Sequence, residues 1–111
     1  MTLDQAQPFE IHQERNGADA AVMRLSGEFD MAGCEDFETA VRTLGQDGLR
    51  QVVIDLADLT FIDSSGIRAL LDSKRRAEEQ GMALVVRVPE AGQVRQVLEL
   101  TGLESHFTIG D

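Results

Sequence analysis

The sequence alternates between segments whose apolar residues repeat every second position and segments whose apolar residues repeat about every 3.6 positions. This alternation limits the possible folds more than any other feature. In residues 8–15, Phe9 and Ile11 lie on one side of an extended chain, which predicts a strand with one buried face. In residues 34–45, apolar side chains recur at i, i+3, i+4 and i+7, which predicts a helix with one buried face. Strands that alternate with helices indicate βαβ units, so we expect an α/β fold with a largely parallel sheet.

Turn and cap residues indicate where the first segments begin and end. Asn16-Gly17 is a strong tight-turn signal, so the first two strands are predicted to form an antiparallel hairpin. Glu35 and Asp36 are expected in the first turn of the first helix, where the helix dipole favours acids. Gly45 is expected to end that helix.

The remaining segments complete an order of β-β-α-β-α-β-α-β. The apolar run 51–56, which extends toward residue 62, is typical of a central strand covered on both faces. Gly81 and Gly102 are expected to end the second and third helices. The expected strands are 8–15, 20–27, 51–56, 82–88 and 106–111, and the expected helices are 34–45, 64–81 and 89–102.

Composition and charge narrow the class of protein. The chain has 111 residues, 42% of them apolar, which suits one globular domain. Its 20 acidic and 10 basic residues give a formal net charge of -10. Such a surface repels nucleic acid and anionic membranes, so neither is an expected partner. The single cysteine, Cys34, rules out an internal disulfide, and the N-terminus has no signal-peptide pattern. We therefore expect a cytoplasmic protein.

The sequence lacks the motifs of catalysis and cofactor binding. It contains no G-x-x-x-x-G-K-[ST] phosphate loop and no G-x-G-x-x-G dinucleotide motif. His12, His106 and Cys34 do not have zinc-site spacing, and Ile62 replaces the first glycine of a G-x-S-x-G nucleophile elbow. The sole lysine, Lys74, lies inside a predicted helix, which argues against the Mg²⁺ pocket of a receiver domain. We expect no cofactor, no metal and no enzymatic activity.

Two polar junctions follow predicted strands and are expected at one edge of the sheet. The first is Asp-Ser-Ser-Gly at 63–66. Residue chemistry leaves two readings open there. Asp63 or Ser64 caps the next helix, which contributes about 1 kcal/mol, or a serine carries a phosphate, which the positive end of a helix tolerates. The second junction is 26–30, and by itself it reads as a polar turn in which Asp30 is an ordinary loop acid.

Three segments together resemble the STAS domain family, specifically its stand-alone anti-sigma factor antagonists. They are RLSGEFD (24–30), VVIDLADLTFIDSSGIRALL (52–71) and GMALVVRVPEAGQVRQVLELTGL (81–103). The resemblance implies a mixed, largely parallel sheet with helices packed against it, an N-terminal β-hairpin, and a single STAS domain over residues 1–111. Family members usually continue into another helix after the last strand. This chain ends at Asp111, so we expect that helix to be either absent or trimmed.

The resemblance also implies a function, namely an anti-sigma factor antagonist that acts as a phosphorylation-controlled binding switch and catalyses no reaction. When unphosphorylated, it would bind a partner that is both anti-sigma factor and serine protein kinase, and the sigma factor would be released. The partner would phosphorylate Ser64, with Ser65 as the second choice, and a serine phosphatase would reverse this step. Within the site, Asp63 and Gly66 are expected chiefly to frame the loop. The residues implied in partner binding are Glu28, Asp30, Asp63, Ser65, Gly66 and Arg68.

Three other functions stay open at this point. A STAS protein can be a scaffold in a stress-signalling assembly or a subunit of a transport system, without this kinase cycle. A nucleotide-binding STAS module is a second alternative, although no phosphate loop supports it. A hydrolase that uses Ser64 or Ser65 is disfavoured, because no motif places a base beside either serine.

Overall fold

The computed structural model describes residues 7–102 and 108–109, and the order of its elements confirms the β-β-α-β-α-β-α-β prediction. The part of the last predicted strand outside Thr108–Ile109 lies outside the described residues. The elements are β1 (Glu10–Arg15), β2 (Ala20–Phe29), α1 (Met31–Gln46), β3 (Gln51–Ile62), α2 (Ser64–Glu79), β4 (Ala83–Val88), α3 (Gln93–Thr101) and β5 (Thr108–Ile109).

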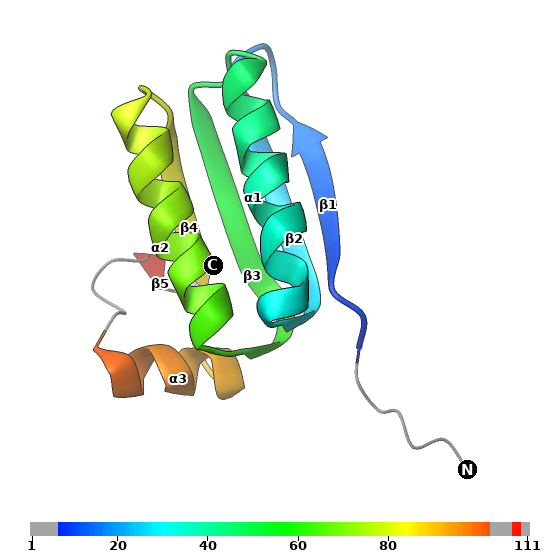
Figure 1. Ribbon diagram of the computed structural model, residues 1–111, viewed down its shortest axis with the longest axis vertical. Coiled ribbons are helices and arrows are strands. Elements are labelled where there is room, and N and C mark those ends of the chain that lie inside the picture. Colours follow the sequence, from blue (N-terminus) through cyan, green and yellow to red (C-terminus); the bar gives the residue numbers. More distant parts are fainter. Residues whose placement is uncertain (1–6, 103–107, 110–111) are drawn as a thin grey trace.

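Within the described residues, five strands form one sheet in the order β1-β2-β3-β4-β5. The hairpin partners β1 and β2 are antiparallel, and every other neighbouring pair is parallel. The predicted mixed, largely parallel sheet with an N-terminal hairpin is therefore confirmed. Figure 1 shows α1 and α2 side by side over one face of the sheet, and α3 across the end at which both of them begin.

The core lies between the sheet and the pair α1 and α2. On the covered face, alternate residues of β2 and β3, such as Met23 and Ile54, are fully buried, and Phe37 of α1 and Leu70 of α2 are fully buried as well. The expectation that β3 is covered on both faces is wrong for this structure, because Val53 on the other face is only half-buried. Since α1 and α2 both pack on the same face of the sheet, the other face of β3 has none of the described helices over it, although the strand is rich in apolar residues.

Local capping moves several boundaries from their predicted places. Asp30 caps α1, so the helix begins three residues before the predicted start at residue 34, and Glu35 and Asp36 lie beyond its first turn. Gly45 lies inside α1 and does not end it. The turn after α1 has its positive φ at Gly48, where φ is 86°.

The predicted ends of the other two helices agree with the structure. Gly81 follows α2 with a φ of 87°, and Gly102 caps α3 with a φ of 73°. β3 continues six residues past 56 and stops at Ile62, as its apolar extension indicated. Among the described residues, no helix is long and apolar enough to cross a membrane.

Candidate functional site at two adjacent helix starts

Asp30 and Asp63 occupy equivalent positions on two neighbouring parallel strands. The last residues of β2 and β3, Phe29 and Ile62, are paired in the sheet, and the next residue of each strand is one of the two aspartates. Both aspartates have extended backbone and both cap the helix that follows. The two polar junctions therefore lie at the same edge of the sheet, where α1 and α2 begin side by side (Figure 1).

The capping contacts are side chain to backbone hydrogen bonds. The Oδ1 atom of Asp30 accepts from the backbone N–H of Ala32 at 3.0 Å. The Oδ1 atom of Asp63 accepts from the N–H groups of Ser65 at 2.9 Å and Gly66 at 3.1 Å. Both carboxylates thereby satisfy N–H groups that a helix start leaves without partners. The capping reading of Asp63 is correct, and Ser64 is the first helical residue rather than the cap.

A short D-x-x-G repeat, which the sequence analysis did not single out, accounts for the similarity of the two helix starts. Gly33 follows Asp30, and Gly66 follows Asp63, by three positions. A Cβ atom on Gly33 would lie 2.6 Å from the Phe9 ring, and one on Gly66 would lie 2.8 Å from the Phe29 carbonyl oxygen. Each glycine therefore lets its helix start pack closely against a neighbouring segment of the same chain. The signal was present in the sequence as two strands that each end in this motif.

Cys34 connects the two helix starts. Its Sγ atom lies 3.4 Å from the carbonyl oxygen of Asp30 and 3.4 Å from that of Ser65, so its single S–H has an acceptor at each helix start. Burial raises the pKa of the Cys34 thiol, and the nearby carboxylates of Glu38, Asp63 and Asp30 raise that pKa further. A thiol that stays neutral is a weak nucleophile, so Cys34 is a structural contact at this site.

The two candidate serines differ in exposure. Ser64 is exposed at the first position of α2, and Ser65 is half-buried beside it. Both line a shallow depression between α1 and α2, together with Cys34 and Arg68. Arg68 is exposed one helical turn after Ser64. The structure thus brings together the four predicted residues that belong to this edge, Asp63, Ser64, Ser65 and Arg68.

The remaining predicted residues lie around this group. Gly66 is buried directly beneath it. Asp30 and Glu28 are half-buried and line a second depression, which Phe9 also borders. Glu28 pairs with Phe61 in the sheet, and it lines this second depression rather than the one that Ser64 and Ser65 line.

Exposed apolar residues at this edge were missed by the sequence analysis. Met31, the first residue of α1, is 75% exposed, and Phe61, next to the last residue of β3, is 37% exposed. Large apolar side chains in contact with water beside polar ones are common where proteins bind proteins. Their signal in the sequence is their position, because Met31 directly follows Asp30 and Phe61 precedes Asp63 by two residues.

Gln93 was also missed, and it fixes α3 to this edge. Its side-chain Oε1 accepts from the backbone N–H of Ile62 at 3.0 Å, and its Nε2 donates to the Ile62 carbonyl oxygen at 3.1 Å. The amide thus binds the last residue of β3 as a neighbouring strand would. Within the described residues, no group of three His, Cys, Asp or Glu side chains could hold a metal ion.

Comparisons with known proteins identify similar chains. A family model described as "Mlab, STAS domain" matches residues 12–109. BtrV of Bordetella bronchiseptica, assigned as an anti-sigma factor antagonist, is 32% identical over 88 residues, which cover 78% of this chain and 74% of that protein. An anti-sigma factor antagonist structure from Mycobacterium paratuberculosis superposes with a TM-score of 0.73 at 27% identity, and covers 92% of this chain and 85% of that one.

The anti-sigma factor antagonist SpoIIAA has a similar fold in two chemical states. Its unphosphorylated form superposes with a TM-score of 0.76 at 24% identity, over 92% of this chain and 89% of that one. Its phosphorylated form superposes with a TM-score of 0.69 at 23% identity, over 92% of each chain. The likeness at this level of identity concerns the fold.

Proposed function

This chain belongs to the STAS domain family, and from that membership we propose that it is an anti-sigma factor antagonist whose binding is switched off by phosphorylation of Ser64. The proposal follows the names of its relatives, which are anti-sigma factor antagonists. It assigns the partner-binding surface to the edge where α1 and α2 begin.

The position of Ser64 carries the proposal. Ser64 is exposed, it begins a helix that is already capped by Asp63, and within the described residues its hydroxyl makes no hydrogen bond. A kinase can therefore reach this oxygen without unfolding the chain. The positive end of α2 also tolerates the charge of about -1.5 to -2 that a phosphate adds.

Ser65 is a poorer acceptor of phosphate. It is half-buried, its backbone N–H donates to Asp63, and its carbonyl oxygen accepts from the Cys34 thiol. A phosphate on this side chain would have to fit between α1 and α2. We therefore retain Ser64 as the modified residue and Ser65 as part of the partner-binding surface.

In the proposed cycle, the unphosphorylated edge binds an anti-sigma factor that is also a serine kinase, and the sigma factor is released. The kinase transfers the γ-phosphoryl group of ATP from its own active site to the Ser64 oxygen. The hydroxyl proton leaves to a base of the kinase, and ADP is the second product. This chain supplies the acceptor oxygen and no catalytic group. A serine phosphatase hydrolyses the ester and restores the binding form.

Charge and desolvation explain how the phosphate would weaken binding. The new charge lies on the residue next to Asp63, and Asp30 begins the neighbouring helix. An interface that fits a neutral hydroxyl there would have to bury a phosphate beside carboxylates, which is unfavourable. We expect the binding surface to keep its backbone shape and to change its charge.

The test is phosphorylation by the cognate kinase with ATP, followed by mass mapping of the modified residue. Wild type and Ser65→Ala should gain one phosphate, and Ser64→Ala should gain none. In a binding assay, Ser64→Ala should bind like wild type, and Ser64→Asp should bind at least about tenfold more weakly. Equal binding of the last two variants, or a phosphate at neither serine, would contradict the proposal.

A further inference from the structure

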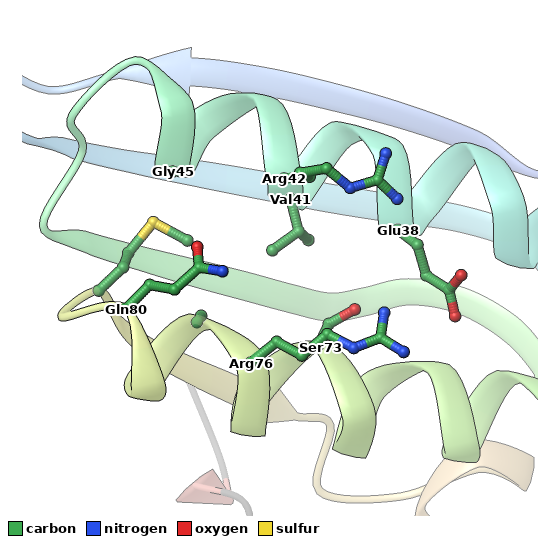
Figure 2. A pocket seen from close by; sticks show the side chains of 9 residues that line it. Glu38, Val41, Arg42, Gly45, Ser73, Arg76 and Gln80 are labelled. Carbon is green, nitrogen blue, oxygen red and sulfur yellow. The ribbon is translucent and has the colours of Figure 1, made fainter.

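A second feature lies between α1 and α2, toward the ends of these helices that are far from Ser64. It is a cavity of about 110 Å³, which we call the α1–α2 cavity. Its apolar wall is formed by Val41, Ala77 and Met82. The polar side chains around it include Arg42 of α1 and Arg76 of α2, which come from opposite sides of the opening (Figure 2).

The two arginines lack partners in the described part of the chain. Neither forms a hydrogen bond or an ion pair there, and the ion pairs present involve other arginines. Arg50, Arg68 and Arg87 form no ion pair there either, so what sets Arg42 and Arg76 apart is that both line the same cavity. Glu38 is the acid that lines the same cavity, and it forms no ion pair with either arginine.

The helix dipole accounts for one of these arginines but not for the other. Arg76 lies in the last turn of α2, where a cation interacts favourably with the helix end. Arg42 lies before the last turn of α1, which contains no basic residue. Both side chains are exposed, so water screens the repulsion between the two guanidinium groups.

Ser73 supplies an independent observation. It is 4% exposed and is the buried polar residue among the described core. It lines the cavity, and its hydroxyl makes no hydrogen bond within the described residues. In Figure 2 this hydroxyl points between the two helices, toward the space that the arginines flank. The oxygen is not sealed from water, so the hydroxyl can donate a hydrogen bond to a molecule inside the cavity.

We propose that the α1–α2 cavity binds a small oxyanion, a phosphate or a carboxylate, between Arg42, Arg76 and Ser73. Guanidinium groups present paired N–H donors that match the oxygens of these anions, and the Ser73 hydroxyl donates from the buried side. A cavity of roughly 150 Å³ holds a benzene molecule, so 110 Å³ suits an anion of a few heavy atoms. The site is separate from the proposed phosphorylation of Ser64 and does not depend on it.

The experiment is a titration of the ¹⁵N-labelled protein with sodium phosphate and, separately, with sodium acetate, each against sodium chloride at equal ionic strength. We expect saturable shifts of the Ser73 and Gln80 amide signals with phosphate or acetate, and none with chloride. The anion that produces them identifies the ligand class. An absence of saturable shifts with both anions would overturn the proposal.

Matched variants locate the site. Arg42→Gln and Arg76→Gln should each weaken the anion affinity by about tenfold or more. Arg75→Gln should not, because Arg75 pairs with Asp72 on the exposed face of α2. The rise in melting temperature that the bound anion gives to wild type should be lost in Arg76→Gln and kept in Arg75→Gln. Equal weakening in all three variants would mean general charge screening and would also overturn the proposal.

Discussion

The thiol of Cys34 in α1 lies 3.4 Å from the carbonyl oxygen of Ser65 in α2, and its hydrogen bond joins the starts of the two helices. The carbonyl oxygen of Asp30, the cap of α1, lies at the same distance from the sulfur, so two acceptors share the single S–H proton. One small side chain thus connects both capped helix starts of the candidate site. Its burial and its acidic neighbours keep the thiol neutral.

The raised pKa of Cys34 predicts slow alkylation. Because the thiolate is the reactive form, iodoacetamide should modify native protein more slowly at pH 8 than protein unfolded in urea. The pH midpoint of the rate should also be higher in the native protein, since burial, Glu38, Asp63 and Asp30 all raise this pKa. Equal rates for native and unfolded protein would contradict this account of the thiol.

The same shift predicts how stability changes with pH. Below the pKa of the unfolded chain, the thiol is neutral in both states and has no effect on the pH dependence. Above it, the unfolded state loses the proton first, so the free energy of unfolding falls as pH rises toward the folded pKa. Urea titrations between pH 7 and 10 should show this decline in wild type and a smaller one in Cys34→Ala.

Gly66→Ala should destabilise the protein. The new Cβ would lie 2.8 Å from the backbone oxygen of Phe29 and 2.9 Å from the Ile62 side chain, which cannot both move away. We expect a loss of about 1–3 kcal/mol in urea unfolding. The matched control is Gly45→Ala inside α1, where the nearest atoms lie at 3.9 Å and 4.0 Å. That change should stabilise the helix by about 0.5–1 kcal/mol.

Asp63→Ala should cost about 1 kcal/mol of stability, because it removes the cap of α2. Asp63→Asn should cost much less, since the asparagine oxygen can accept the same hydrogen bonds. Asp58 is exposed and makes no contact of this kind, so Asp58→Ala is the control and should stay within about 0.5 kcal/mol of wild type. A similar loss for Asp63→Asn and Asp63→Ala would show that charge, rather than capping, is what the helix start requires.

Gln93→Leu should release α3 from the end of β3. It removes both hydrogen bonds to Ile62, so the backbone N–H and the carbonyl of that residue each lose this partner, and we expect a loss of about 1–3 kcal/mol. Hydrogen exchange of the Ile62 amide should accelerate. Gln96→Leu, at an exposed position of the same helix, should change neither quantity. Unchanged hydrogen exchange at Ile62 in the Gln93→Leu variant would show that the Gln93 side chain does not hold α3 to the end of β3.

The sequence sufficed for the order of elements, the hairpin and the parallel sheet, because these depend on periods and turn residues that a single chain displays. It also indicated that 26–30 and 63–66 meet at one edge, since the carboxyl ends of parallel strands do so. It failed at the start of α1, because the acids at Glu35 and Asp36 resemble a first turn as much as Asp30 resembles a cap.

The long-range contacts that shape the site could not be predicted from any pattern in the sequence. Cys34 and Ser65 are 31 residues apart, as are Ile62 and Gln93. A side chain that binds a distant backbone group leaves no periodic signal, because the contact depends on how the elements pack. The open face of β3 was missed for a related reason, since Val53 is apolar whether or not a helix covers it.

The tight packing at Gly66 bears on how long the phosphorylated form lasts. The start of α2 is pressed against the end of β2, so Ser64 is mounted on a part of the chain that has little room to move. Under the proposed function, the two forms of the protein then share one conformation and differ by one ester bond. Such a protein cannot relax from one form to the other by itself. It holds a chemical memory whose lifetime is set entirely by the opposing kinase and phosphatase.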